Sequence, residues 1–351
     1  MRWACSAGAI VPLDHENTKV GPMRPTSWAA SAIGQRQQVI RQVAIVVRIG
    51  QTPRVQGSSG IRDPSIESTP NCSESIVKEF LIIMMPVFFL VVAEGCRAAP
   101  AVPAIVAHRG ASQDAPENTL AAFKLGFEQG ADCVEGDFRM TSDGHIVAMH
   151  DRTLSRTTGD TREINQTSLM DVRSLSAGDW GSWKGGDFQT ERVPTLSEVL
   201  AIIPADGGIL LEIKDSDRIV PELVRELERS GIGTDQITVI AFDRTVVERL
   251  KKISPKWKAL WLTSFSKKTG SWRPDVDEVI DVALAIGADG VDLKAESEVV
   301  DQAFVDRVKS AGLEIHVWTV NETEIALRMR SIGIDSITTD CPAVIIKAFD
   351  Q

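Results

Sequence analysis

Residues 104–340 repeat one unit, a short apolar run with a helical pattern beside it, and this repetition limits the possible folds more than any other feature. Eight strand-like runs alternating with helices over about 250 residues match the size and order of a (β/α)8 TIM barrel, an α/β fold. The strand-like runs are Ala104–His108, Cys133–Phe138, Ile209–Lys214, Ile237–Phe242, Lys258–Thr263, Asp289–Lys294, Glu314–Thr319 and Ser336–Asp340. The helical patterns include Glu117–Gln129, Asp217–Ser230, Arg244–Ile253, Pro274–Ile286, Ser297–Ala311 and Asn321–Ile332.

An open doubly wound sheet is the alternative architecture, but no glycine-rich dinucleotide loop follows any of these runs. In a barrel, functional side chains gather at the C-terminal ends of the strands. Charged residues stand at or near these ends in five or more of the runs, and barrel strands are covered by helices and have no solvated side. The charged residues are His108, Arg109, Glu135, Asp137, Glu212, Lys214, Asp292, Lys294, Glu314, His316 and Asp340.

Glu135 and Asp137 are the most informative of these residues. They lie two apart in a run that alternates like a β-strand, so both carboxylates project from one face. A turn at residues 142–144 and a second short strand then lead to His150 and Asp151. A buried carboxylate pair is costly because like charges repel and lose hydration, and a divalent cation would resolve that conflict. The alternative is a solvated face with an ordinary surface histidine.

Composition narrows the possible partners. The 351 residues carry a net charge of −10, which gives no indication of a nucleic-acid partner. Residues 1–79 hold nine Lys/Arg and six Asp/Glu, a net charge of +3, so the rest of the chain carries −13. Such an acidic domain is compatible with binding a cation. There is no tyrosine to serve as acid, base or nucleophile. No pair of the five cysteines has metal-type spacing, and their odd number argues against a disulfide framework. We expect Cys133 and Cys341 to be small buried apolar residues.

The first hundred residues differ from the rest. Residues 1–76 show little periodicity, and we interpret them as a poorly ordered leader or as a segment outside the natural protein, translation then starting near Val77. Residues 77–96 contain an uncharged apolar run at 80–93, the length of a signal-peptide core or of a short membrane anchor. A lipid attached at Cys96 is a second route to the membrane, although Glu94 departs from the lipobox pattern. Residues 97–103 are a linker, and the expected location is secreted, periplasmic or envelope-anchored in a bacterium.

Short fragments across the C-terminal part resemble the glycerophosphodiester phosphodiesterase family when they are taken in order, from about residue 104 to 342. The fragments are His108-Arg109-Gly110, Pro116-Glu117-Asn118-Thr119, Glu135-x-Asp137, Asp143-Gly144, His150-Asp151, Leu154 with Arg156-Thr157-Thr158, Pro194-Thr195-Leu196, Glu212-x-Lys214, Trp318-Thr319-Val320-Asn321 and Thr339-Asp340-x-Pro342. Residues 152–194, with Trp180 and Trp183, resemble the loop insertion that this family places between early barrel elements. The two tryptophans either cover the substrate or pin the insertion.

The resemblance implies a TIM-barrel domain over residues 104–351 that hydrolyses glycerophosphodiesters to glycerol 3-phosphate and an alcohol. It implies attack by the glycerol 2-hydroxyl through a cyclic phosphate, with one divalent cation. Carried over by position, the metal ligands are Glu135, Asp137 and Glu212, the acid–base residues are His108 and His150, the phosphate contacts are Arg109 and Lys214, and the aromatic near the glycerol is Trp318. Ligands that are all oxygen favour Ca²⁺ or Mg²⁺.

Other readings stay open at this point. A second hypothesis is a phospholipase-D-like enzyme that acts on lysolipids or sphingolipids. A third, non-enzymatic hypothesis is a phosphodiester-binding protein without catalysis. The head-group alcohol, the order of action of the histidines and the oligomeric state are not determined by the sequence.

Several polar residues have structural interpretations. We expect His145 to be structural or exposed, His316 to fill the barrel interior, and Asn118 to begin a helix. Asp292 and Lys294 can pair with each other, or Lys294 can reach the site.

Overall fold

The computed structural model describes residues 102–351. The predicted leader, the signal-like segment, Cys96 and most of the linker lie outside the described residues. Among the helices of residues 102–351, none is long and apolar enough to cross a membrane.

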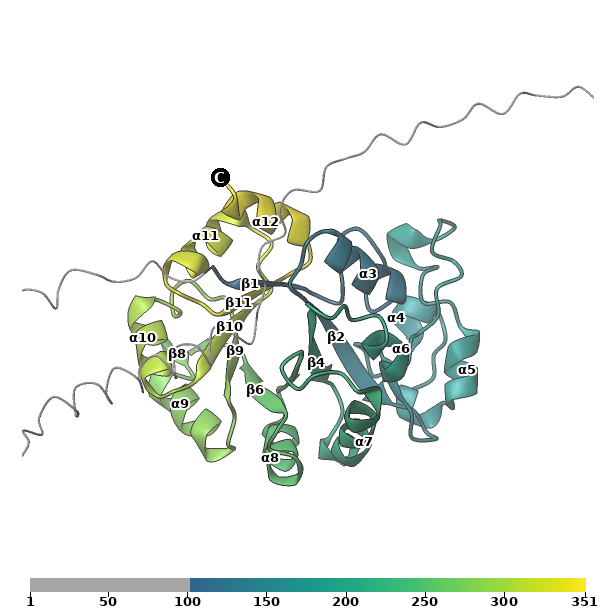
Figure 1. The fold of residues 1–351 in the computed structure, drawn as a ribbon, viewed down its shortest axis with the longest axis horizontal. Helices are drawn as coiled ribbons and strands as arrows, with labels where there is room; N and C mark the ends of the chain where they lie inside the picture. Colours follow the sequence, from purple (N-terminus) through teal and green to yellow (C-terminus); the bar gives the residue numbers. More distant parts are fainter. Residues whose placement is uncertain (1–101) are drawn as a thin grey trace, which may run out of the picture.

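Eight parallel strands close into a barrel, which confirms the predicted fold (Figure 1). Each strand pairs with the next, and β1 pairs with both β2 and β11, so the sheet has no open edge between its first and last strands. The barrel strands are β1 (Ala104–Ala107), β2 (Cys133–Met140), β4 (Gly208–Ile213), β5 (Ile237–Ala241), β6 (Lys258–Thr263), β9 (Gly290–Lys294), β10 (Glu314–Trp318) and β11 (Ser336–Thr339).

Helices surround the strands (Figure 1). The larger ones are α3 (Leu120–Glu128), α7 (Val220–Ser230), α8 (Arg244–Ile253), α9 (Val276–Ala285), α10 (Gln302–Ser310), α11 (Thr323–Ser331) and α12 (Pro342–Phe349), with the shorter α6 (Leu196–Leu200) and η3 (Asp217–Ile219). Several begin later than the periodicity predicts because a polar side chain caps the first turn. Thr119 accepts from the Ala122 N–H at the start of α3, and Asp301 accepts from the Phe304 N–H at the start of α10.

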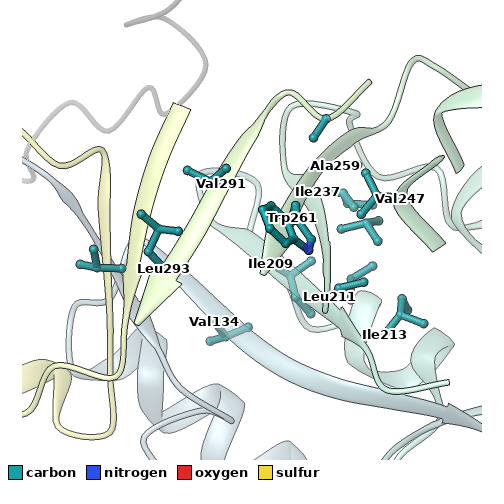
Figure 2. Close-up of a cluster of buried hydrophobic side chains, with 14 of the residues drawn as sticks. Val134, Ile209, Leu211, Ile213, Ile237, Val247, Ala259, Trp261, Val291 and Leu293 are labelled. Carbon is teal, nitrogen blue, oxygen red and sulfur yellow. The ribbon is translucent and has the colours of Figure 1, made fainter. Parts of the chain in front are cut away.

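The two faces of each strand have different environments. Outward-facing side chains form the main apolar core between the strands and the helices, and Figure 2 shows a cluster of them that includes Val134, Leu211 and Trp261. Inward-facing residues form a smaller apolar cluster, with Val106 and Leu260 among its members. Both faces are therefore buried, as in other parallel sheets, and a polar inward side chain has to find a partner inside the barrel.

The predicted hairpin after β2 is present. Strand β3 (Ile146–Ala148) runs antiparallel to β2 and pairs Phe138 with Ala148. The insertion that follows is more structured than a simple loop and lies beside the barrel (Figure 1). It contains α4 (Ser155–Thr158), η1 (Ile164–Gln166), α5 (Leu169–Ser174) and η2 (Gly181–Trp183). These elements bury Leu154, Ile164 and Val172 in a small apolar cluster of their own. A second hairpin, β7 (Ser266–Lys268) and β8 (Ser271–Arg273), follows β6 and was not predicted.

Candidate active site

Three carboxylates meet inside the barrel near the C-terminal ends of two neighbouring strands. Glu135 and Asp137 lie on β2 and Glu212 on β4, where Asp137 and Glu212 are register partners. One oxygen of each lies within 4.8 Å of the others, and all three residues are buried. The structure thus brings together the three predicted metal ligands.

Gly136, between the two acidic residues of β2, explains how this strand fits against its helix. A Cβ at this position would lie 2.9 Å from the ring of Phe123 on α3, closer than real contacts allow. Because side chains alternate along a strand, the side that lacks a side chain at Gly136 faces the helix, and Glu135 and Asp137 face inward. The same close packing that requires a glycine therefore places two carboxylates in the barrel.

The charges of this cluster are poorly balanced without a cation. Burial and the charges of Asp137 and Glu212 raise the pKa of Glu135 well above its ordinary value. Burial and the charge of Asp137 also raise the pKa of Glu212, to about 7. The Oε1 atom of Glu135 is buried and accepts no hydrogen bond within residues 102–351. Three converging carboxylates with a free buried oxygen fit a hard divalent cation, which takes oxygen ligands.

Arg109 and Lys214, the two residues that the resemblance suggests for contacts with the phosphate, lie against these carboxylates. Nε of Arg109 is 3.1 Å from Asp137 Oδ2, and Nζ of Lys214 is 2.5 Å from Glu212 Oε1 and 3.2 Å from Asp137 Oδ1. Burial alone would raise the pKa of Asp137, but these two cations hold it below its ordinary value. Arg109 and Lys214 therefore lie where an anion approaching the carboxylates would meet positive charge.

The loop after β1 holds Arg109 in an unusual backbone conformation. Arg109 has φ = 55°, in the left-handed region that costs a non-glycine residue energy. Its backbone N–H donates to Glu135 Oε2 at 2.9 Å. The next residue, Gly110, has φ = 79°, and a Cβ there would lie 2.3 Å from the backbone of Ala122. Gly110 is thus required for the backbone to pass this close to α3.

Each of the two predicted acid–base histidines binds a carboxylate through Nδ1. His108 Nδ1 lies 2.6 Å from Asp340 Oδ1, and His150 Nδ1 lies 2.7 Å from Asp151 Oδ1. Nε2 of His108 is 3.9 Å from Glu135 Oε2, so this imidazole borders the carboxylate cluster. The sequence predicted both histidines and places Asp151 next to His150 in the chain, whereas the pairing of His108 with Asp340 is a feature that only the fold reveals.

Asp340 is itself held by several donors. Asn321 Nδ2 donates to Oδ2 at 2.6 Å, and Ser112 Oγ donates to Oδ1 at 2.9 Å. Burial alone would raise the pKa of Asp340, but the hydrogen bonds from His108, Asn321 and Ser112 hold it at about 2. Asp340 therefore stays ionised and keeps a fixed acceptor against His108.

Asn118 differs from its predicted role. The helix α3 is capped by Thr119, and Asn118 instead has φ = 58° and turns its amide toward the carboxylate cluster. Its Nδ2 donates to Asp137 Oδ2 at 2.8 Å, and its Oδ1 accepts from the Asp137 N–H at 3.0 Å. This pair of bonds orients Asp137. An asparagine before a capping threonine was the available signal, because asparagine tolerates the left-handed conformation.

Trp318 lies at the end of β10 beside an aromatic residue that the sequence did not single out. Its ring packs edge-to-face against Phe242, with centroids 5.6 Å apart, and Nε1 donates to the backbone oxygen of Asp292 at 3.3 Å. Lys214 Nζ lies 5.8 Å from the centre of the Phe242 ring, which is 44% exposed. The two rings thus form an aromatic wall next to Lys214.

The remaining polar residues follow their structural interpretations in most cases. His145 is exposed and His316 is buried in the barrel, where Nδ1 lies 2.5 Å from Ser336 Oγ. The structure shows no ion pair between Asp292 and Lys294: Asp292 is buried, with an Oδ1 that accepts no hydrogen bond among the described residues, and Lys294 is exposed. Cys133 and Cys341 are both buried free thiols, as expected.

The comparisons with known proteins agree with this site. Residues 108–344 match the model of the Glycerophosphoryl diester phosphodiesterase family. The glycerophosphodiester phosphodiesterase of Caldanaerobacter subterraneus subsp. tengcongensis is 30% identical over 247 residues, which are 69% of this chain and 96% of the relative. The glycerophosphodiester phosphodiesterase of Bacillus subtilis is 27% identical over 250 residues, 68% of this chain and 83% of the relative.

Solved structures show the same relationship. An Oleispira antarctica phosphodiesterase in complex with the product sn-glycerol-3-phosphate has a TM-score of 0.62 and 29% identity, covering 71% of this chain and 98% of its own. A glycerophosphodiester phosphodiesterase from Agrobacterium tumefaciens has a TM-score of 0.59 and 25% identity, covering 70% and 99%. The chain is therefore a phosphodiesterase with a TIM-barrel fold. It belongs to the glycerophosphodiester phosphodiesterase family.

Proposed function

We propose that the protein hydrolyses glycerophosphodiesters to glycerol 3-phosphate and an alcohol, with Ca²⁺ or Mg²⁺ held by Glu135, Asp137 and Glu212. The observation that carries the proposal is the convergence of these three buried carboxylates, one with an unpartnered oxygen, between two basic side chains. A cation bound there would supply charge neutralisation at the phosphate and make the attacking hydroxyl more acidic. The structure of a relative with bound sn-glycerol-3-phosphate supports the substrate class.

The basic residues prepare the phosphate for attack. A phosphodiester anion repels nucleophiles, so positive charge at its non-bridging oxygens is the first requirement. Arg109 presents a planar guanidinium that can grip two oxygens, and Lys214 presents a point charge. Both side chains are largely buried, with 20% and 15% of their surface exposed, so their charges act with little screening by water.

The histidines move the protons. In the first step the glycerol 2-hydroxyl oxygen bonds to phosphorus while the bond from phosphorus to the alcohol oxygen breaks. One imidazole takes the proton of the 2-hydroxyl, and the other gives a proton to the departing alcohol. Water then opens the resulting cyclic phosphate with the two roles reversed, which releases glycerol 3-phosphate. The carboxylate at each Nδ1 fixes the ring and leaves Nε2 of His108 and His150 for this exchange.

The aromatic wall is proposed to border the substrate. Phe242 and Trp318 present apolar surface beside Lys214, where the carbon atoms of glycerol or of the alcohol would lie if the phosphate contacts Lys214. An apolar wall next to a charged contact orients a small polar molecule without competing for its hydrogen bonds.

Release of glycerol 3-phosphate from glycerophosphocholine by the purified protein tests the proposal. The protein is first treated with a chelator and then supplied with Ca²⁺ or Mg²⁺. Release that stops with the chelator and returns with either ion is the expected result. A folded protein that releases nothing with either ion would contradict it, and lysolipid and sphingolipid substrates would then test the phospholipase-D-like alternative.

We also propose that the protein is exported to the bacterial envelope. The support is the apolar run at 80–93 and Cys96 in the sequence, both outside the described residues. Mass spectrometry of the N-terminus of the natural protein tests this proposal. Peptides from residues 1–70 would contradict removal of the leader, and a mature chain that starts near residue 96 is the expected result.

A further inference from the structure

Arg156 in the insertion joins two segments of the site that are far apart in sequence. It lies on the four-residue helix α4, and its side chain is 39% exposed. Its Nη1 and Nη2 donate to Glu117 Oε2 and Oε1 at 2.7 and 2.8 Å. Its Nε and Nη2 donate to Asp151 Oδ2 and Oδ1 at 2.7 and 3.2 Å. One guanidinium thus binds two carboxylates with both sides of its planar fork.

The same carboxylate oxygens bind the residues that act on the substrate. Asp151 Oδ1 is the atom that lies 2.7 Å from His150 Nδ1. Glu117 Oε1 is the atom that accepts from Arg109 Nη1 at 3.0 Å. Nη2 of Arg156 contacts both of these shared oxygens. An acid–base histidine and a phosphate-binding arginine are therefore connected through a single nitrogen of Arg156.

The insertion also holds Arg156 from its other side. The guanidinium carbon lies 5.5 Å from the ring centre of Trp180, in the range of a cation–π contact. Trp180 is fixed in turn because Nε1 donates to the backbone oxygen of Ala177 at 2.9 Å. Trp180 therefore connects Arg156 to the rest of the insertion.

We propose that Arg156 is a positioning residue for the reaction, holding His150 and Arg109 in a fixed relative geometry through Asp151 and Glu117. This inference rests on the proposed function of the site. Without Arg156, Asp151 can rotate away from His150, and the imidazole loses the acceptor that selects its tautomer. Glu117 would then also bind Arg109 alone and draw it from the phosphate. The rotation of Asp151 and the displacement of Arg109 would both change the distance between the imidazole and the phosphate, on which the rate depends.

A purely structural role would give a different pattern of results. The Arg156 side chain is 39% exposed and its partners Glu117 and Asp151 are 11% and 28% exposed, so the melting temperature of each variant is measured to separate a loss of stability from a loss of kcat. Arg162, in the same insertion, offers a matched control, because it pairs with Asp160 and Asp171 and contacts none of the residues of the site. We expect Arg156→Ala to lower kcat by about 10- to 100-fold, the range seen when partners of catalytic groups are removed. Arg162→Ala leaves kcat and the melting temperature close to those of the wild type.

The conservative variant separates charge from geometry. Arg156→Lys keeps the positive charge, but an ammonium group cannot bind two carboxylates with a planar fork. We therefore expect Arg156→Lys to recover only a small part of the lost kcat. Full recovery in this variant would contradict the positioning role, because charge alone would then explain the effect.

A double-mutant cycle tests whether Arg156 acts through His150. All variants are measured on glycerophosphocholine with saturating cation, together with their melting temperatures. If Arg156 positions the imidazole, Arg156→Ala costs much less kcat in the His150→Ala background than in the wild type, because coupled residues are not additive. Additive losses would contradict the proposal, and so would a near-normal kcat in Arg156→Ala. Absence of activity in the wild type would contradict the proposed function instead of this inference.

Discussion

The Nδ1 atom of His108 lies 2.6 Å from the Oδ1 atom of Asp340, although 232 residues separate them in the sequence. Strands β1 and β11 are neighbours in the closed barrel and bring the ends of the chain's domain together. His150 has the same relationship with Asp151, the residue that follows it. Two histidine–carboxylate pairs therefore flank the acidic cluster, one formed by local sequence and one by closure of the barrel.

Both histidines are expected to be needed for turnover. His108→Ala or His150→Ala should lower kcat by at least about 10²-fold, the usual contribution of a positioned acid or base. His145→Ala is the control, because this histidine is exposed and only its backbone bonds to Thr141. Steady-state rates on glycerophosphocholine check the prediction. Near-normal activity in both of the first two variants would refute the assignment of these histidines.

The acidic cluster is expected to bind a cation that stabilises the fold. With Ca²⁺ at about 100 times its Kd, the free energy of unfolding should rise by about 2.7 kcal/mol. Glu135→Gln should abolish this rise, and without cation it should be at least as stable as the wild type, because one of three repelling carboxylates is gone. Thermal melts with chelator and with Ca²⁺ measure both effects.

Glu228→Gln is the matched control for that experiment. Glu228 lies on α7 and pairs with Lys256 at the surface, 3.0 Å away. Its substitution removes the same charge outside the acidic cluster and should keep the full stabilisation by Ca²⁺. A Glu135→Gln protein that responds to Ca²⁺ as the wild type does would show that the cation binds elsewhere.

Asn118 is expected to set the affinity of the cation site through Asp137. Asn118→Ala and Asn118→Gly both remove the two hydrogen bonds to Asp137 and should weaken Ca²⁺ binding by about 10- to 100-fold. Glycine adopts φ = 58° without strain and alanine does not, so the glycine variant should be the more stable of the two. Calorimetric titration with Ca²⁺ tests the affinity. If Asn118→Gly keeps wild-type affinity, the side-chain bonds do not orient the ligand.

Asp292 is expected to make stability depend on pH. Its carboxyl is buried in the barrel, and burial raises its pKa to about 7. Its register partners are His316 on β10 and Leu262 on β6, and the charge of Asp292 also reaches Glu212. Because the folded pKa lies above the unfolded value near 4, the folded state binds the proton more tightly. The contribution of Asp292 to the free energy of unfolding is therefore fully present below pH 4 and is lost as the pH rises to 7.

Asp292→Asn tests that dependence. Above pH 7 the free energy of unfolding of the variant should exceed that of the wild type by up to roughly 4 kcal/mol, since each unit of pKa shift corresponds to about 1.4 kcal/mol. Near pH 4 the difference should almost vanish. Urea unfolding of both proteins with chelator at pH 4.5 and pH 8 measures the difference, which includes the effect of Asp292 on the neighbouring Glu212. An equal difference at the two pH values would contradict the prediction.

The sequence by itself determined the architecture and indicated the residues of the candidate site. Period-two and helical patterns depend on neighbours a few residues apart, so the eight strands and their order were readable without a structure. The acidic residues on β2 and β4 and the two histidines were readable too, because charged residues on buried strands are costly and have to be explained by function. The resemblance to a family then gave each of them an expected role.

Only the tertiary structure decided which partner each polar atom takes. Asp340 reaches His108 because the barrel closes, and Arg156 reaches Glu117 because the insertion folds back over the loop after β1. Asn118 turned out to orient Asp137 instead of capping a helix, since its left-handed backbone is imposed by the loop. Hydrogen bonds of this kind act over about 3 Å between residues that are distant in sequence. Local sequence patterns do not predict such contacts, because the distances between these residues are set by the packing of the whole domain.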